Sequence, residues 1–131
     1  MGKTMSTKAR DKMKKLSDIP VLEENASLKK ALDLMSEKRL GIACFVDKAG
    51  ALKGLLTDGD LRRLLLTKQS PLPALLIADA LSFGISKPSV AHENDGIDKL
   101  KELMSAKQIW DLPIIDSNNK LIGLLHRHDA N

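Results

Sequence analysis

Aromatic residues are nearly absent from the sequence. Phe45, Phe83 and Trp110 are the only ones among 131 residues and make up 2% of the chain. A protein that binds single-stranded nucleic acid by stacking bases on aromatic rings needs more of them. The core must therefore be aliphatic, and a general single-strand binder is excluded. The 43% of hydrophobic and 29% of charged residues are typical of a folded globular domain.

Cysteine and long apolar runs are also scarce. Cys44 is the only cysteine, so the chain cannot form an internal disulfide, and a lone thiol inside an apolar run suits a reducing compartment. No apolar run reaches the length of about 18 residues that a membrane-spanning helix requires. No apolar segment typical of a secretory signal follows the basic start. We therefore expect a cytoplasmic protein with no membrane partner.

The positive charge is confined to one end of the chain. The net charge is +4, but residues 1–16 contain six lysines and arginines against one aspartate, so residues 17–131 are slightly acidic. Basic segments can attract nucleic acid. Their confinement to the N-terminal end favours a solvated leader or linker instead, and we expect no nucleic-acid partner.

The chain contains an internal repeat. A shift of 69 residues aligns positions 22–60 with 91–129 without a gap, and about a third of the aligned residues are identical. The matches include Leu34-Met35-Ser36 with Leu103-Met104-Ser105, and Gly54-Leu55-Leu56 with Gly123-Leu124-Leu125. We therefore predict a basic leader or linker at 1–16, a first repeat at 17–69, a linker at 70–76 and a second repeat at 77–131. The chain ends two residues after Asp129, so the last helix of the second repeat is expected to be truncated.

Each copy is predicted to contain a strand, a helix, two strands joined by a hairpin, and a second helix. Apolar residues at helical spacing indicate one helix that starts after Ser27 and another that starts after Asp95 or Gly96. Apolar runs and tight turns predict a series of paired strands, at 42–46 and 52–56 in the first copy and at 112–115 and 121–125 in the second. Pro71 and Pro73 end the helix after the first copy, and residues 74–81 predict a short helix.

Polar residues follow the last strand of each copy. They are Thr57-Asp58-Gly59-Asp60 in the first and His126-Arg127-His128-Asp129 in the second. Thr57, Asp58 and Asp60 suit the first turn of a helix, because their oxygens can accept hydrogen bonds from backbone N–H groups that lack partners there. The same position attracts anions. Helix capping and ligand binding are both compatible with these residues.

The repeat and its motif resemble the CBS domain pair, or Bateman module, over residues 17–131. The resemblance implies an α/β (α+β) fold of two βαββα repeats packed with pseudo-twofold symmetry, with clefts that bind adenosine nucleotides or related ligands. A narrower set of segments resembles the C-terminal CBS pair of arabinose-5-phosphate isomerases. These segments are Asp18-Ile19-Pro20-Val21, Ala26-Ser27-Leu28-Lys29, Leu40-Gly41-Ile42-Ala43, the run from Thr57 to Arg63, and the run from Leu125 to Asp129.

That resemblance implies a parent enzyme that makes the precursor of Kdo for lipopolysaccharide or capsule, with its sugar isomerase domain upstream of the pair. The CBS pair of some sugar nucleotidyltransferases also carries a Thr-Asp-Gly-Asp-x-Arg-Arg run and is an alternative. A purely structural oligomerisation module is another. The 131 residues supply no convincing acid–base site. We therefore expect a ligand-sensing regulatory module that is not itself an enzyme and requires no cofactor.

The resemblance also implies a ligand site. Its expected residues are Ile42, Thr57, Asp58, Asp60, Arg62, Arg63, His126, Arg127, His128 and Asp129. Asp60 and Asp129 would accept hydrogen bonds from ribose hydroxyls. Thr57 would contact phosphate, whereas His126 at the matching position departs from the family pattern. Arg62 and Arg63 can meet a phosphate or only solvate the helix.

The expected ligand is an adenosine nucleotide or a CMP-sugar. Imidazole and carboxylate groups near Asp129 also permit a metal site, but the His-x-His-Asp signal is weak and we expect none. Three consecutive leucines, Leu64 to Leu66, predict an apolar surface on the helix after the first motif. We therefore expect a homodimer or a higher homo-oligomer.

Overall fold

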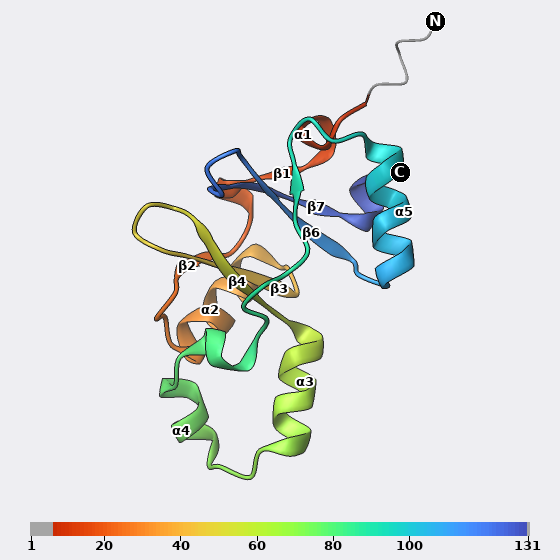
Figure 1. Cartoon of the computed structure of the whole chain (residues 1–131). Helices are drawn as coiled ribbons and strands as arrows, with labels where there is room; N and C mark the ends of the chain where they lie inside the picture. The colour runs from red at the N-terminus through yellow and green to blue at the C-terminus, as the bar shows by residue number, and fades with distance from the viewer. Residues whose placement is uncertain (1–6, 131) are drawn as a thin grey trace, which may run out of the picture. The chain divides into compact units, whose positions relative to one another are not determined.

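The structure is a computed structural model that describes residues 7–130 (Figure 1). The chain forms two compact units. The first, which we call the central unit, consists of residues 17–88. The second, which we call the split unit, combines residues 7–16 with residues 89–130.

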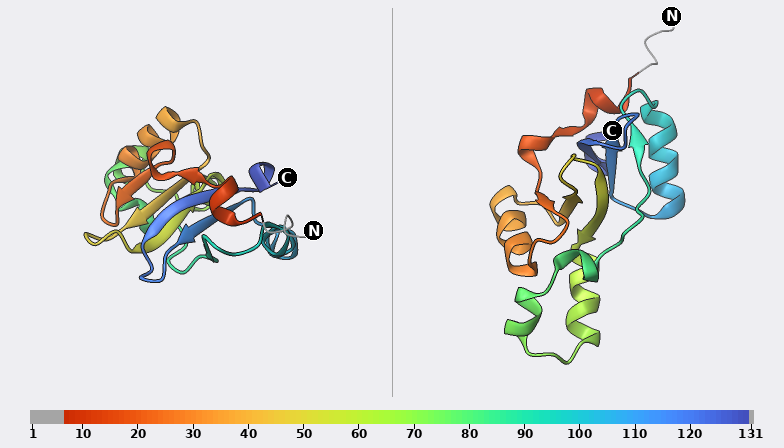
Figure 2. Two further views of the ribbon diagram at one scale, coloured as in Figure 1. Left: turned by 90° about the horizontal axis from the view of Figure 1, so that it is seen from above. Right: turned by 60° about the vertical axis from the view of Figure 1, so that its left-hand side comes forward.

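The central unit is built on a three-stranded sheet in the order β2-β3-β4. β2 runs parallel to β3, and β3 runs antiparallel to β4. The helix α2 covers one face of this sheet through the buried residues Leu28, Ala31 and Met35 (Figure 2). The elements are η2 (Leu16–Asp18), β2 (Val21–Glu23), α2 (Leu28–Lys38), β3 (Ile42–Val46), β4 (Leu52–Thr57), α3 (Asp58–Thr67), α4 (Leu72–Ile77) and η3 (Ala80–Phe83).

The split unit contains a four-stranded sheet in the order β1-β7-β6-β5. The helix α5 packs on it through the buried residues Ile97, Leu100 and Met104. The elements are α1 (Ala9–Lys12), β1 (Lys14–Lys15), β5 (Ala91–His92), α5 (Ile97–Lys107), β6 (Asp111–Ile115), β7 (Leu121–His126) and η4 (Arg127–Ala130). Its core is aliphatic, as the composition predicts.

The local signals for helix starts and hairpins are confirmed. Ser27 is the N-cap of α2, and its Oγ accepts a hydrogen bond from the Lys30 N–H at 3.1 Å. Gly96 is the N-cap residue of α5. The two hairpin turns contain Gly50 and Asn119 with φ of 89° and 65°, the left-handed conformation that these residue types tolerate best.

The interpretation of residues 1–16 as a solvated leader is wrong for the part that the structure describes. Ala9 is fully buried, and its N–H donates to the Asp95 carbonyl at 2.9 Å. Lys14 and Lys15 pair antiparallel with β7. The basic composition did not predict this pairing, because a strand joins a sheet through backbone N–H and C=O groups, which lysine has like any other non-proline residue. Residues 1–6 lie outside the described part of the chain.

Residues 79–86, which connect the two repeats, pack on the central unit as residues 8–15 pack on the split unit. Asp79 forms an isolated antiparallel β-bridge with Ser27, and Lys8 forms one with Gly96 in the split unit. Ser27 and Gly96 are equivalent positions of the 69-residue repeat. Ala80 and Ala9, one residue further along, are both fully buried. Each unit is therefore completed by a segment that precedes a repeat, and residues 8–15 correspond to residues 79–86 at a shift of 71.

Two predicted elements differ from the structure. The helix expected over residues 74–81 is divided into α4 and η3, because Ala78 is extended. Its carbonyl accepts the Leu28 N–H at 2.9 Å, which satisfies a donor at the start of α2. After β7 the chain forms only the short 3-10 helix η4 within the described residues, in place of a helix as long as α3.

Candidate functional site

In the first repeat, the predicted site residues form a helix cap. Thr57 ends β4 and is the N-cap of α3. Asp60 Oδ2 accepts from the Thr57 N–H at 2.9 Å and lies 3.1 Å from Thr57 Oγ1, which itself accepts from the Asp60 N–H. Arg63 forms an ion pair with Asp60 Oδ1. Only 5% of Asp60 is exposed, so this carboxylate is buried and both of its oxygens have partners.

Gly41 lies beside the first residue of α3. Asp58 donates its N–H to the Gly41 carbonyl at 2.9 Å, just before β3 begins. A Cβ on Gly41 would lie 2.3 Å from Asp58 Oδ2, so a larger residue at position 41 would require the exposed Asp58 side chain to move. Ile42, the next residue, pairs with Thr57 and is buried, whereas Arg62 and Arg63 are exposed.

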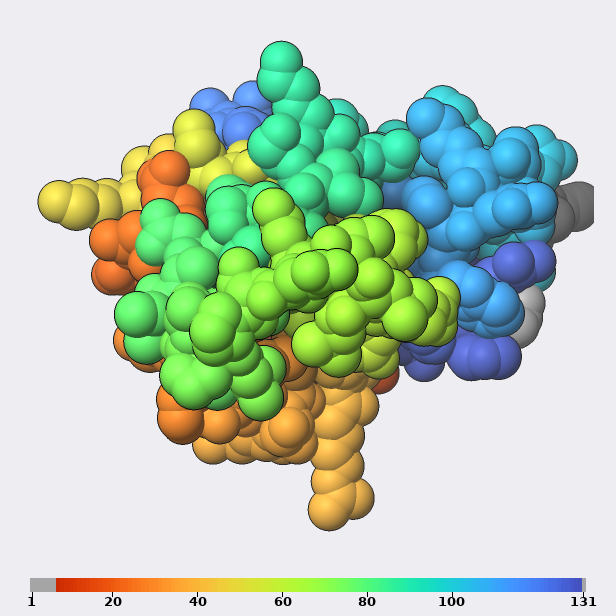
Figure 3. Space-filling view, turned by 90° about the horizontal axis from the view of Figure 1, so that it is seen from below, coloured from red at the N-terminus to blue at the C-terminus, as the bar shows by residue number. Residues whose placement is uncertain are grey.

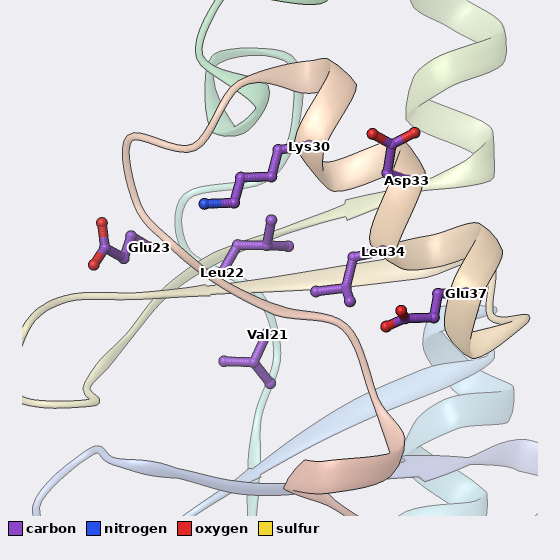
Figure 4. Close-up of a pocket in the computed structure, with 7 residues that line it drawn as sticks. All are labelled: Val21, Leu22, Glu23, Lys30, Asp33, Leu34 and Glu37. Carbon is purple, nitrogen blue, oxygen red and sulfur yellow. The ribbon is translucent and has the colours of Figure 1, made fainter.

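Two cavities lie in the central unit. One, of about 330 Å³, is lined by Leu32, Met35, Ser36, Arg39, Leu40, Gly41 and Asp58, so it reaches the predicted site. The other, of about 390 Å³, lies between α2 and β2 and contains none of the predicted site residues (Figure 4). Its lining mixes the apolar Val21, Leu22 and Leu34 with the charged Glu23, Lys30, Asp33 and Glu37.

The second repeat places different chemistry at the matching positions. Trp110 and Asp111 stand where the first repeat has Gly41 and Ile42, and His126 and Arg127 stand where it has Thr57 and Asp58. The backbone is the same, because the Arg127 N–H donates to the Trp110 carbonyl at 2.8 Å. The four side chains of the second repeat form two contacts, each between one residue of either pair. Asp111 Oδ1 lies 2.8 Å from His126 Nδ1, and the Arg127 Cζ lies 5.1 Å from the Trp110 ring centroid.

These side chains form a partly exposed cluster. The His128 ring lies 5.8 Å from the Trp110 ring and 5.2 Å from the His126 ring, measured between centroids. Trp110 is 54% exposed. Arg127 is also fixed by a 3.1 Å hydrogen bond to Ser105 Oγ. An exposed indole beside an arginine and two imidazoles offers a flat apolar surface next to groups that bind phosphate.

Sequence reasoning missed Trp110 and Asp111. The 69-residue alignment contained the signal for both, because it places them opposite a glycine and an apolar residue, at the start of the strand that pairs with the motif. Asp111 and His126 both differ from their counterparts in the first repeat, which is typical of residues in contact. Only the strand register shows that these two positions face each other.

Asp129 differs from its counterpart Asp60. Its Oδ2 lies 3.2 Å from Lys14 Nζ, and 35% of its side chain is exposed. Within residues 7–130, no arginine pairs with it as Arg63 pairs with Asp60. Among residues 7–130, no group of three His, Cys, Asp and Glu side chains is placed to hold a metal ion. In the same residues, no helix is long and apolar enough to span a membrane.

The repeats, the caps and the two sheets define a known class of domain. The family model described as CBS domain matches residues 8–67 and 82–130. The chain therefore belongs to the CBS domain family, and it carries two copies of the domain. The predicted α/β fold and the resemblance to a CBS pair are confirmed.

The proteins with similar sequences are longer than this chain. The chain is 35% identical over 129 residues to an uncharacterized protein of Helicobacter pylori (strain ATCC 700392 / 26695), and 32% identical over 130 residues to the arabinose 5-phosphate isomerase KdsD of Yersinia pestis. Each match covers 98% of this chain but only 37% and 38% of those proteins. The chain thus spans less than two-fifths of the length of these relatives.

Solved structures show the same fold. The chain matches the crystal structure of CBSX2 in complex with AMP with a TM-score of 0.82 at 24% identity, over 94% of this chain and 92% of that one. It matches the CBS domain pair of protein MJ0100, in complex with 5'-methylthioadenosine and S-adenosyl-L-methionine, with a TM-score of 0.80 at 20% identity, over 94% and 91% of the chains.

Proposed function

We propose that the chain is a ligand-sensing regulatory module that binds a nucleotide or a sugar nucleotide, either an adenosine nucleotide or a CMP-sugar. The observation that carries this proposal is the cluster in the second repeat. Trp110 offers a ring on which a base can stack, and Arg127 and the two histidines lie beside it for a phosphate. Two proteins of the same fold contain AMP, or 5'-methylthioadenosine and S-adenosyl-L-methionine, which supports an adenosine-type ligand.

The two repeats are unequal as candidate ligand sites. Asp60 is buried, and its oxygens already accept from Thr57 and Arg63. A ligand hydroxyl would have to displace these partners. Asp129 is partly exposed and, among the described residues, is paired with Lys14, so it retains room to accept a hydrogen bond from ribose. We infer that the second repeat is the stronger ligand site, and that Ile42, Thr57, Asp58, Asp60, Arg62 and Arg63 form a separate and weaker site in the first repeat.

The parent protein is proposed to be an arabinose-5-phosphate isomerase of Kdo biosynthesis for lipopolysaccharide or capsule, with a sugar isomerase domain upstream of this module. The relatives named KdsD support this assignment. The alternative is a CBS pair of a sugar nucleotidyltransferase. In either parent this module would bind the regulatory ligand and leave the chemistry to another domain.

A homodimer is also proposed, and the exposed apolar surface of the central unit supports it. Leu64 faces the core, but Leu65 and Leu66 on α3 are 64% and 80% exposed, and Ile77 on α4 is 80% exposed. Figure 3 shows the lime and green atoms of α3 and α4 gathered on one face. Large exposed apolar patches typically mark contacts between proteins. We expect Leu66→Asp to convert the dimer to a monomer in analytical ultracentrifugation. A wild-type monomer at all concentrations would contradict the proposal.

A binding screen tests the ligand proposal directly. The chain contains one tryptophan and no tyrosine, so its intrinsic ultraviolet fluorescence reports on Trp110. AMP, ATP, CMP and a CMP-sugar are each titrated while fluorescence and the melting temperature are recorded. We expect at least one to quench Trp110 and to raise the melting temperature, since a ligand at 100 times its Kd stabilises the folded state by about 2.7 kcal/mol.

The control for this screen is Trp110→Phe, which removes the fluorescence signal but retains an aromatic ring. It should keep the rise in melting temperature. Arg127→Ala should weaken binding, because it removes a cationic group of the cluster. Absence of both signals with all four ligands at millimolar concentration would contradict a nucleotide-sensing function and favour a structural module.

A further inference from the structure

The ion pair between Lys14 and Asp129 joins the segment before the first repeat to the proposed ligand site of the second. Lys14 Nζ lies 3.2 Å from Asp129 Oδ2. We propose that Lys14 is a positioning residue: it orients the Asp129 carboxylate for the ligand, and it thereby couples ligand binding to the chain that enters from upstream. This inference rests on the proposed function and adds a route by which the bound state is transmitted.

The backbone determines where Lys14 lies. In β1, Lys14 pairs with Leu124 and Lys15 pairs with Gly123. A Cβ on Gly123 would lie 2.7 Å from the Lys14 carbonyl oxygen and 2.6 Å from Met13 Sδ. The missing side chain of Gly123 therefore allows β1 to approach β7 closely. The Lys14 side chain is half-buried, with 32% exposed, whereas Lys15 is exposed.

In the described part of the chain, the first repeat has no such link. Ile85 forms a β-bridge with Leu55, and Lys14 pairs with Leu124. Because Leu55 and Leu124 are equivalent in the 69-residue repeat, Ile85 takes the place of Lys14 in the central unit. An isoleucine at that place cannot pair with a carboxylate. Asp60 takes its cation from Arg63, three residues along the same helix. The coupling is therefore restricted to the second repeat and to the segment that leads into the module.

The chemistry of the pair allows it to act together with a ligand. A carboxylate has two oxygens, and Lys14 contacts Oδ2, so Oδ1 can accept a hydrogen bond from a ribose hydroxyl. Without Lys14, the Asp129 side chain is free to adopt other rotamers. A ligand that holds Asp129 in this orientation also favours the position of β1. By linkage, displacement of β1 weakens ligand binding by the same factor.

Four variants of the whole chain test the proposal with AMP as the probe. They are Lys14→Met, Lys15→Met, Asp129→Asn and the double variant Lys14→Met/Asp129→Asn. Lys15→Met is the matched control, because it removes the same charge from the same strand at an exposed position. We expect Lys14→Met to raise the Kd for AMP by about two- to fivefold, the range of a partly exposed ion pair, and Lys15→Met to leave it unchanged. In the Asp129→Asn background, Lys14→Met should have no further effect.

A second readout separates positioning from a general loss of structure. AMP should slow amide hydrogen exchange at residues 13–15 in the wild type and in Lys15→Met, but less in Lys14→Met. Lys14→Arg should restore most of the affinity, because it restores the cation. Equal Kd values for Lys14→Met and Lys15→Met would overturn the coupling while the proposed function stands. A wild-type chain that binds no AMP would overturn both for this ligand class.

Discussion

Removal of residues 1–16 should destabilise the split unit although this segment precedes the first repeat. The described part of the segment makes three backbone hydrogen bonds with the second repeat. Ala9 N–H donates to Asp95 and Arg10 N–H to Glu93, and Thr7 accepts from the Ile97 N–H, at 2.9 to 3.0 Å. Each such bond contributes about 0.5–1.5 kcal/mol. With the pairing of β1 and β7 also lost, we expect the free energy of unfolding of the split unit to fall by about 2–4 kcal/mol.

Urea unfolding followed by Trp110 fluorescence measures this change, because Trp110 is the only tryptophan and belongs to the split unit. With an m-value of about 2 kcal/mol/M, the middle of the usual range for urea, the transition midpoint should fall by roughly 1–2 M. A chain that begins at Thr7 is the control, since it retains the three hydrogen bonds and β1. An unchanged Trp110 midpoint after removal of residues 1–16 would refute the assignment of this segment to the split unit.

Two further predictions concern single residues of the split unit. Gly123→Ala should lower the free energy of unfolding by about 1–3 kcal/mol in urea titrations, because its Cβ would clash with β1. An unchanged free energy of unfolding would contradict this close approach of β1. Hydrogen bonds from the Lys120 and Asn118 N–H groups hold the pKa of Asp116 below its ordinary value. This carboxylate therefore stabilises the fold above about pH 4, and the contribution is lost as pH falls through the lowered pKa. Asp116→Asn should flatten the dependence of the unfolding midpoint on pH below about pH 4; an unchanged slope would show that Asp116 is not responsible.

Local features of the fold could be predicted from the sequence because their causes lie within a few residues. The N-cap Ser27 and the turn residues Gly50 and Asn119 satisfy backbone requirements that any chain has at these points. The role of residues 8–15 could not be predicted in this way. At the shift of 71, Ala9 and Ala80 are their only identical pair with the connecting segment, and the contacts of both segments run through backbone groups.

The helix cap at the candidate site could be predicted, but the charged partners of the two aspartates could not. Thr57 and Asp60 form the cap that their spacing predicts. Of the matching residues, His126 ends β7 and Asp129 lies in the 3-10 helix η4. The sequence did not show that Asp60 is buried with Arg63 whereas Asp129 faces Lys14, more than a hundred positions away. Pairings of that kind depend on which segment reaches the edge of a sheet.

The divided sequence of the split unit has a consequence for synthesis on the ribosome. The central unit is one continuous segment, residues 17–88, and can fold as soon as it emerges. The strand β1 emerges earlier but has no partner until the chain has been made through residues 89–130. Synthesis of residues 17–130 takes roughly 6–23 seconds at usual elongation rates. During that time its backbone groups are open to other nascent chains. Lysines at the edge of a sheet oppose such pairing. The basic residues around β1 are therefore well suited to keep a waiting strand from aggregating until its own sheet exists.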